Sequence, residues 1–501
     1  MNKRILVVVV LAVVVMGGVA SGAPEGWSDD VRLTNNASGS AYPAIAPSGN
    51  NLHVVWEDDR DGNMEIYYKN STDIGVSWNG DVRLTNAVND SNMPAIAANG
   101  SNLHIVWYDF RDGNSEIYYK NSTNGGATWS SDVRLTNDLG SSGFPSMAVN
   151  GNNIHVVWTD SRVGNLEIYY KNSTDNGATW SSDMRLTNDV SESYTFMPQA
   201  IAVNGNNIHV VWYDNRDGNF EIYYKNSTDN GATWGSDMRL TNNASWSQEP
   251  AIAVSGTNIQ VVWRDGRDGA NGEIYYKNST DNGATWSADV RLTNDASESA
   301  YPAIALNGSY IHVVWADWRD GDQEIYYKNS TDNGATWSSD MRLTNAAGGS
   351  IYPDIAVNGS SIHVVWGDSR DGNYEIYYKR SPPFPPPAIT SWGNTKTNNA
   401  SLNVTVSISE QITFNATANQ TITNWNWFKD GLNQSWNYYN ITLNWDTNGS
   451  KTVQVNATNA NGMSNTIQWN VTVLDVTPPV ITNVTNSTVN VSGNSPKTFV
   501  T

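Results

Sequence analysis

Two short apolar stretches separated by a polar turn recur along most of the chain. In one copy, residues 154–158 and 167–171 flank a turn at residues 160–165. β-Branched and aromatic residues fill both stretches, which predicts two strands, and glycine with asparagine in the turn predicts a hairpin. Residues 145–149 and 184–187 add a strand before and a strand after this pair. Each copy therefore predicts a sheet of four short strands.

The copies follow one another at a nearly fixed interval. The tryptophan that ends the second predicted strand recurs every 51 to 54 residues, at Trp56, Trp107, Trp158, Trp212, Trp263, Trp315 and Trp366. A period near fifty that is filled with short strands is typical of a β-propeller. The chain also holds 22 tryptophans and 24 tyrosines, and its mature part shows no helical period. We therefore expect an all-β protein.

The two ends of the repeat region complement each other. Residues 27–34 repeat the fourth-strand sequence found at 180–187, whereas residues 353–379 supply three strands and lack the fourth. Sharing one sheet between the two ends removes exposed strand edges. The sequence therefore predicts a closed seven-bladed propeller over residues 24–380, with its seventh blade divided between 27–34 and 353–379.

The flanking segments predict a secreted protein with further modules. Residues 1–23 place Lys3 and Arg4 before an apolar run and small residues, which is typical of a secretory signal peptide, and no second membrane span follows. Residues 381–387 form a proline-rich linker. Alternating runs in residues 388–475 predict a second all-β unit, and residues 476–501 begin a further, incomplete module or form a disordered tail. We expect a secreted or cell-surface location.

The amino-acid composition limits the kinds of partner and chemistry that we expect. The formal net charge of −20 argues against nucleic acid as a ligand, and the absence of cysteine excludes disulfides and thiolate chemistry. Numerous Asn-x-Ser/Thr sequons suggest a glycoprotein.

A second recurrent motif carries a family resemblance. Ser-x-Asp-x-Gly-x-Thr-Trp stands intact at residues 173–180, 227–234, 279–286 and 330–337, and altered at 71–78 and 122–129. It resembles the Asp-box, or BNR repeat, of the sialidase-like propellers, in which it is a structural turn remote from catalysis. Its aspartates here are Asp73, Asp175, Asp229, Asp281 and Asp332. Similarly, Asn424-Trp-Asn-Trp427 and the run at 451–459 resemble a PKD-type immunoglobulin-like sandwich.

The turn between the second and third strands repeats an aspartate, an arginine and a glutamate. The clearest copies are Asp58, Arg60 and Glu65, then Asp214, Arg216 and Glu221, then Asp368, Arg370 and Glu375. One interpretation is structural, with each arginine forked onto an acid of its own or the next blade. The second interpretation is a calcium site, although the arginine in every loop argues against binding of a cation. We assign no metal and no cofactor, with calcium as the alternative.

The third interpretation is catalysis of the sialidase type. The resemblance implies three converging arginines, a tyrosine–glutamate pair and an aspartate. Because every arginine and acid of these turns has equivalent copies, we find no unique Arg-Glu-Tyr cluster and assign no catalytic residue. The six histidines also share one repeat position, which Gln260 occupies in the fifth copy. We expect them to be half-buried and bonded to backbone groups.

Positions that vary among the copies are free to carry specificity. On the face of these turns, Tyr108, Phe110, Tyr213, Arg264 and Trp318 are the candidate ligand-binding residues. The function that we expect is non-catalytic recognition or adhesion, with a glycan or a surface protein as partner. The alternatives are a sialidase-like exo-glycosidase and a purely structural envelope component, and the oligomeric state is left open.

Overall fold

Strands are the only regular elements in the described part of the chain. The computed structural model describes residues 27–195, 199–269, 271–381, 389–397, 401–418, 422, 424–459, 462–476, 480–485 and 488–492. Among them no helix is long and apolar enough to cross a membrane. The all-β prediction is confirmed. The predicted signal peptide at 1–23 and residues 382–387 of the predicted linker lie outside the described residues.

Seven sheets make up residues 27–381, and we number them along the chain. Sheet one consists of β2 (Ser40–Ser48), β3 (Asn51–Asp58), β4 (Glu65–Ser71) and β5 (Val82–Arg83), paired in this order. Sheet two consists of β6 (Ser91–Asn99), β7 (Asn102–Asp109), β8 (Glu116–Ser122) and β9 (Val133–Arg134). Sheet three consists of β10 (Ser142–Asn150), β11 (Asn153–Asp160), β12 (Glu167–Ser173) and β13 (Met184–Arg185).

The later sheets follow the same order. Sheet four has a divided first strand, β14 (Ser193–Tyr194) and β15 (Ile201–Asn204), then β16 (Asn207–Asp214), β17 (Glu221–Ser227) and β18 (Met238–Arg239). Sheet five consists of β19 (Ser247–Ser255), β20 (Asn258–Asp265), β21 (Glu273–Ser279) and β22 (Val290–Arg291). Sheet six consists of β23 (Ser299–Asn307), β24 (Tyr310–Asp317), β25 (Glu324–Ser330) and β26 (Met341–Arg342). The outer strands have two residues each, shorter than the four that the sequence predicts.

Sheet seven joins the two ends of the repeat region. β27 (Ser350–Asn358), β28 (Ser361–Asp368) and β29 (Glu375–Arg380) are completed by β1 (Val31–Arg32), which pairs with β29. The Ile376 amide donates to the hydroxyl of Thr34 over 2.8 Å, and Asp30 lies 2.7 Å from Arg370 and 2.9 Å from Lys379. The first and last segments of the region thus share one sheet.

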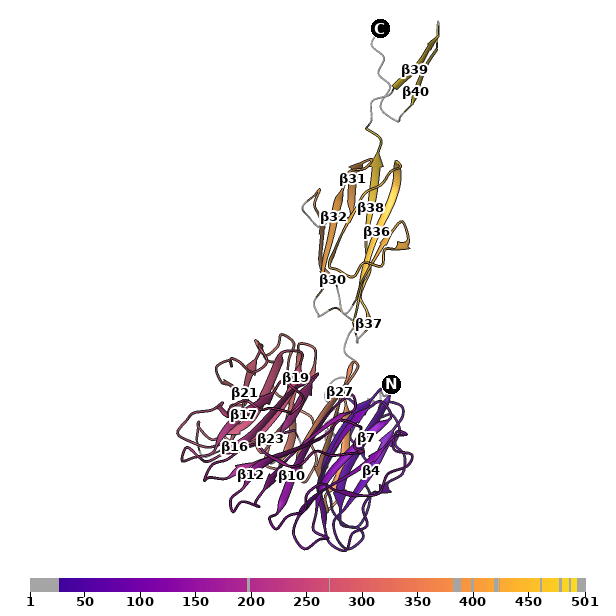
Figure 1. Ribbon diagram of the computed structural model, residues 1–501. Coiled ribbons are helices and arrows are strands. Elements are labelled where there is room, and N and C mark those ends of the chain that lie inside the picture. Colours follow the sequence, from indigo (N-terminus) through magenta and orange to yellow (C-terminus); the bar gives the residue numbers. More distant parts are fainter. Residues whose placement is uncertain are drawn as a thin grey trace, which may run out of the picture.

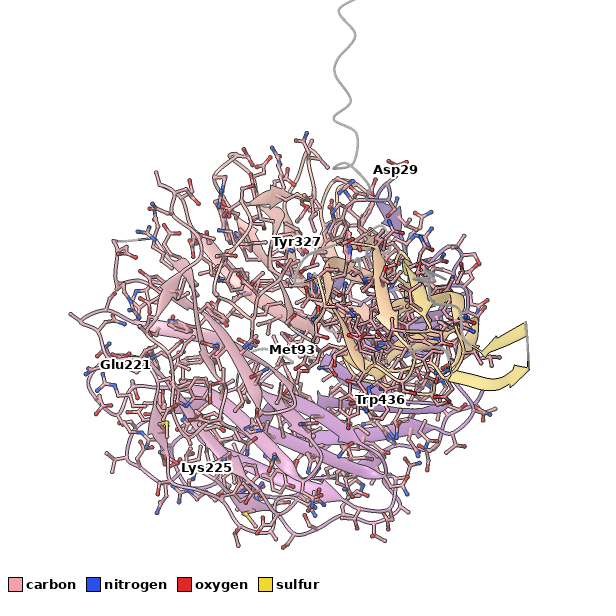
Figure 2. The ribbon with its side chains drawn as sticks, turned by 90° about the horizontal axis from the view of Figure 1, so that it is seen from above. Asp29, Met93, Glu221, Lys225, Tyr327 and Trp436 are labelled. Carbon is pink, nitrogen blue, oxygen red and sulfur yellow. The ribbon has the colours of Figure 1, made fainter. Side chains whose placement is uncertain are left out.

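The seven sheets stand in a ring. Their first strands contact one another in the cyclic order β2, β6, β10, β15, β19, β23, β27 and back to β2. Figure 2 shows Met93 of β6 near the middle of the ring, whereas Glu221 of the third strand β17 lies toward the rim. The strands of each sheet therefore run in order from the axis outward. We call the side that carries the turns between second and third strands the turn face.

Large aromatic side chains fill the spaces between neighbouring sheets. The tryptophan of each second strand is fully buried, as Trp56 is among residues of sheets one and seven. The Asp-box turns close the opposite side. Gly177 has φ of +85° and approaches Tyr119 of the preceding sheet so closely that a Cβ would lie 2.1 Å from its hydroxyl oxygen. Trp180 packs edge-on against the same ring, with centroids 4.9 Å apart. Each turn thus fixes its sheet to the previous one.

Residues 389–476 form a separate body (Figure 1). One sheet pairs β30 (Ile389–Asn394), β32 (Ile412–Ala418) and β35 (Asn440–Leu443). The other pairs β31 (Asn403–Ser407), β38 (Ile467–Leu474), β36 (Gly449–Asn459), β33 (Asn424–Lys429) and β34 (Leu432–Asn433), with β37 (Gly462–Met463) beside β36. Buried Trp427 and Trp469 stack in its core with centroids 6.0 Å apart. Beyond it, β39 (Val480–Thr485) and β40 (Thr488–Ser492) pair as a hairpin.

Candidate ligand-binding site

One buried aspartate closes each turn on the turn face. In sheet one, the carboxylate of Asp58 is fully buried, and its two oxygens accept hydrogen bonds of 2.7 and 2.5 Å from the guanidinium of Arg60. The Trp56 indole donates to it over 2.9 Å. Burial alone would raise the pKa of Asp58, but the hydrogen bonds from Arg60 and its neighbours outweigh burial and hold the pKa below its usual value.

The guanidinium of Arg60 is held on its other sides as well. Its Nη1 donates to Asp81 over 2.8 Å, and its carbon lies 4.3 Å from the centroid of the Tyr67 ring. Glu65 does not contact Arg60, and binds Arg83 of the outer strand over 2.8 Å. The other predicted turns repeat this division, with pairs Asp214–Arg216, Glu221–Arg239, Asp368–Arg370 and Glu375–Arg32. These side chains fix the turns to the outer strands.

Carboxylates pair with nearly all of the arginines that the structure describes. In the ranges that the structure describes, every arginine except Arg380 contacts a carboxylate, and Arg380 donates to the carbonyl of Ile74. A calcium ion in the first turn would have to displace Arg60 from Asp58. Across those ranges, no group of three or more acidic or histidine side chains is placed to hold a metal.

The Asp-box aspartates stabilise turns at the opposite ends of the third strands. Asp175 accepts the amide of Thr179 over 2.8 Å and its hydroxyl over 2.6 Å, and Ser173 donates to it over 2.8 Å. The hydrogen bonds from Thr179 and Ser173 lower the pKa of Asp175 to about 2. The same contacts recur at Asp73, Asp229, Asp281 and Asp332. These aspartates therefore lie away from the turn face.

The histidines bind tyrosines, so the predicted backbone partners are wrong. Nδ1 of His209 lies 2.7 Å from the hydroxyl oxygen of Tyr224, and His209 is fully buried. The pairing recurs as His53–Tyr68, His104–Tyr119, His155–Tyr170, His312–Tyr327 and His363–Tyr378. Gln260 preserves this pairing in the fifth copy, because its Oε1 accepts a hydrogen bond from the hydroxyl of Tyr276. Burial lowers the pKa of His209 to about 4, so the ring is neutral at physiological pH.

The five predicted ligand-binding residues have different surroundings. Tyr108 is partly buried and touches Phe110, with ring centroids 5.7 Å apart, and Phe110 is 38% exposed. Tyr213 is only 9% exposed and lies between Tyr194 and Phe220. Tyr213 is therefore buried and not exposed on its turn, because it belongs to the hydrophobic cluster between sheets four and five.

Arg264 and Trp318 lie nearer to a cluster that the sequence pattern did not predict. Trp318 is partly buried and packs against the same hydrophobic cluster as Tyr301 and Tyr352. Arg264 lies over the ring of Trp246, 4.8 Å from its centroid. Both residues therefore border the inner strands of sheets five to seven, where the backbone has an unusual conformation.

A strained bulge interrupts the first strand of six sheets. In each, the residue before a proline has a left-handed φ between +46° and +55°, at Tyr42, Met93, Phe144, Glu249, Tyr301 and Tyr352. The strand register shifts at the same place. Bulky residues rarely adopt this conformation, and a bulge redirects the side chain. Such strain costs about 1–3 kcal/mol at each residue and is typical of functional sites.

Three bulge tyrosines from three sheets meet. Tyr352 stacks on Tyr42, with centroids 4.2 Å apart and planes at 27°, and lies 4.7 Å from Tyr301. All three are partly exposed. Burial and the neighbouring Tyr352 raise the pKa of Tyr42, so its hydroxyl is neutral and can donate a hydrogen bond. We call these three residues the tyrosine shelf.

Glu249 breaks the symmetry of the repeats beside the shelf. Glu249 is the only acid among the pre-proline residues of the repeats. Its carboxylate lies 3.0 Å from Arg264 and accepts the backbone amide of Tyr301 over 3.0 Å. Burial raises the pKa of Glu249 against the opposing charge of Arg264. Comparing the residues before the prolines among the seven copies would have exposed Glu249 in the sequence.

A second buried acid adjoins the tyrosine shelf. Glu57 follows the tryptophan of β3, is 5% exposed, and accepts the amide of Met93 over 2.9 Å. Burial, with the charges of Asp90 and Asp59, raises the pKa of Glu57 to about 7. Near neutral pH it therefore exchanges a proton readily and can donate or accept a hydrogen bond.

Beneath the bulges the inner strands line a cavity of about 180 Å³. Its lining is aliphatic except for Gln199 and Asp354, which meet across it over 2.8 Å. Burial raises the pKa of Asp354 to about 6, although the amides of Ile45 and Ile355 donate to it. The Gln199 side chain also accepts the amide of Ile304 over 2.9 Å. These two residues link sheets one, four, six and seven through the middle of the ring.

Comparison with known proteins agrees with this architecture. Residues 144–364 match the model of a BNR repeat-like domain. The ring is a β-propeller. An ulvan lyase of polysaccharide lyase family PL25 is similar to the chain with a TM-score of 0.50 and 13% identity, over 68% of this chain and 93% of that one.

Two further structures resemble the propeller. A protein of unknown function from Dyadobacter fermentans has a TM-score of 0.48 and 13% identity, over 72% of this chain and 100% of its own. A Trypanosoma rangeli sialidase has a TM-score of 0.44 and 14% identity, over 72% of this chain and 60% of its own. No curated protein matches the chain. At these identities the likeness extends to the fold alone.

Proposed function

We propose that the chain is a secreted or cell-surface recognition protein that binds an uncharged glycan at the tyrosine shelf without cleaving it. The observation that carries this proposal is the meeting of Tyr42, Tyr301 and Tyr352 on strained bulges of three different sheets. Partly exposed aromatic faces beside a few fixed polar groups suit a sugar ring, which has an apolar face and a polar rim.

The charges around the shelf favour a neutral ligand. Arg264 is already paired with Glu249 and Glu298, and the turn arginines are forked onto their aspartates. An acidic sugar would have to compete with these carboxylates for every guanidinium. A neutral sugar needs only hydrogen bonds, which Glu57 and the tyrosine hydroxyls can supply. The sialidase and lyase names among similar structures agree with a glycan as ligand.

The test is a glycan array probed with the full chain and with Tyr301→Ala and Tyr352→Ala variants. We expect the unaltered chain to bind neutral glycans and each variant to lose about 1–3 kcal/mol of binding free energy, as for a central aromatic contact. Leu139→Ala is the matched control, because Leu139 is fully exposed in a loop of the same face. Equal binding by all four proteins would place the site elsewhere.

A sialidase-like exo-glycosidase is the second candidate, because Glu249 pairs with Arg264 beside Tyr301 in only one of the described sheets. This function predicts release of the fluorophore from a fluorogenic sialoside by the full chain. It also predicts that Glu249→Gln and Glu57→Gln abolish that release. A rate equal to that of buffer would exclude this activity while leaving glycan binding to be measured.

We propose further that the seven sheets are the blades of a closed seven-bladed propeller over residues 24–380. Pairing of β1 with β29 supports this closure. We also propose that residues 388–475 are an immunoglobulin-like sandwich of the PKD type, since two sheets pack there around Trp427 and Trp469. The residues 1–23 remain our predicted signal peptide.

A further inference from the structure

The second body exposes three aromatic rings in one short segment. Trp436, Tyr438 and Tyr439 are 46%, 62% and 58% exposed, and they lie between β34 and β35. We call residues 434–440 the aromatic segment. Exposed aromatic side chains that cluster in this way mark an interaction surface more often than isolated ones do. The segment is in a different body from the tyrosine shelf.

The backbone of the aromatic segment is anchored to the core of its body. The Gln434 amide donates to the carbonyl of Trp427 over 2.8 Å. The Trp427 indole donates to the carbonyl of Tyr438 over 2.8 Å, and the Ala416 amide donates to that of Tyr439 over 2.9 Å. Because these hydrogen bonds hold the backbone from the inside, the exposed rings project from a rigid support. Little conformational entropy would be lost when a ligand settles on them.

The Trp436 ring is also held in place. The Trp436 indole donates to the carbonyl of Asn440 over 2.7 Å, and its ring lies 5.4 Å from that of Tyr438. Ser435, which precedes it, has a φ of +51°, a conformation that serine seldom adopts. Strain of this kind persists where the surroundings enforce it and is concentrated at ligand-binding positions. The segment therefore presents Trp436 and Tyr438 in a defined arrangement.

The surroundings of the rings are polar but uncharged. The segment contains no acidic or basic residue, and Asn424, Asn426 and Asn437 lie in it or in the adjoining strand β33. The nearest charged residues before it are already engaged, since Lys429 donates to the Asn444 carbonyl and Asp430 accepts the Trp445 indole. An ionic ligand would find no counter-charge there. Amides and aromatic faces instead match the hydroxyls and the apolar faces of sugar rings.

We propose that the aromatic segment binds a neutral polysaccharide and so gives the protein a second carbohydrate-binding surface. The rings stack on consecutive sugar units, and the neighbouring amides bond to their hydroxyls. The proposal stands whether or not the propeller binds a glycan. If both surfaces bind the same polysaccharide, attachment at one raises the effective concentration at the other.

The test is sedimentation of the full chain with insoluble cellulose and chitin and affinity electrophoresis in soluble laminarin. The decisive variant combines Trp436→Ala, Tyr438→Ala and Tyr439→Ala. We expect it to bind at least about tenfold more weakly, the change that follows the loss of one central aromatic contact. Leu474→Ala is the control, since Leu474 is 47% exposed on β38 of the same body and should leave binding unchanged.

Two further variants distinguish the aromatic segment from the propeller as the binding surface. Tyr438→Phe keeps the ring and should keep most of the binding. In a chain that already carries Tyr352→Ala, which alters the propeller, adding the triple substitution should still weaken binding about tenfold. Equal binding by the triple variant and the unaltered chain overturns the proposal, as does failure of the unaltered chain to bind any of the three polysaccharides. A triple variant that changes only the sedimentation coefficient would show a surface for self-association, which also overturns it.

Discussion

At the scale of single residues, the turns depend on opposite charges that are largely removed from water. Asp214 is fully buried, and Arg216 reaches it with one side of its guanidinium while the other contacts Asp237. A buried carboxylate that loses its partner keeps its desolvation cost. The arginine is therefore more important for stability than a surface ion pair would be.

Arg216→Ala should destabilise the propeller by about 2–4 kcal/mol, because breaking a buried pair costs about 3–5 kcal/mol and Arg216 keeps 22% of its side chain exposed. Urea unfolding followed by tryptophan fluorescence measures the loss. Arg216→Lys is the matched variant. It keeps the charge but loses the fork, so we expect an intermediate value. Unchanged stability in both would show that Asp214 is held by its other donors alone.

The buried histidines make stability depend on acid. The folded pKa of His209 is lowered to about 4, whereas an unfolded histidine has a pKa of about 6.5. Unfolding therefore takes up protons between these values, and stability is full above about pH 6.5 and falls as the pH is lowered toward 4. His209→Gln copies the natural Gln260 and should reduce proton uptake at pH 5 by about one proton. Unfolding free energies between pH 4 and 7 give this slope, and Gln260→His should steepen it.

At the scale of elements, closure of the ring depends on a strand of two residues. β1 brings with it Asp30, Leu33 and Thr34, which bond to Arg370, to the carbonyl of Ile376 and to the amide of Ile376. A chain that begins at Asn36 should therefore melt at a lower temperature than one that begins at Trp27, because β29 is left as an exposed edge. Calorimetry of both chains measures the difference. Equal melting temperatures would show that sheet seven does not need β1.

The turns between second and third strands should not respond to chelators. Their aspartates already accept hydrogen bonds from arginine, tryptophan and serine, which leaves a calcium ion without free carboxylates. We expect the melting temperature of the full chain to stay the same in EDTA and with added calcium. A melting temperature that falls by several degrees in EDTA would show instead that these turns bind calcium. Asp58→Asn would then test whether the first turn holds the ion.

At the scale of the whole molecule, the sequence predicts the strands and turns that recur in every copy. It does not predict the contacts that form between different sheets around the axis of the ring. The tryptophan period and the Asp-box motif suffice to predict an all-β propeller, because each copy contributes the same strands and the same turns. The tyrosine shelf depends on which sheets become neighbours, and on a bulge before proline that no local propensity favours. Gln199 and Asp354 are 155 residues apart and meet only because the ring brings them across its axis.

The contact between Glu249 and Arg264 could be found in a sequence only through departures from the repeat. Glu249 replaces an apolar or aromatic residue before proline, and Arg264 is the only basic residue that directly follows a second-strand tryptophan. Each substitution by itself has no meaning in one chain. Their contact shows that the two departures belong together, and the periodic pattern carries no information on contacts between neighbouring strands.

The divided seventh sheet also affects how the propeller resists mechanical unfolding. The chain leaves the ring from the end of β29, which is hydrogen-bonded on one side to β28 and on the other to β1. Tension along the axis of β29 would load both rows of hydrogen bonds at once, in shear, so they would have to break together and not one after another. The rate of such forced unfolding is set by the barrier and not by the equilibrium stability. A propeller tethered through its C-terminal end would therefore hold under a pull because its first residues clamp its last strand.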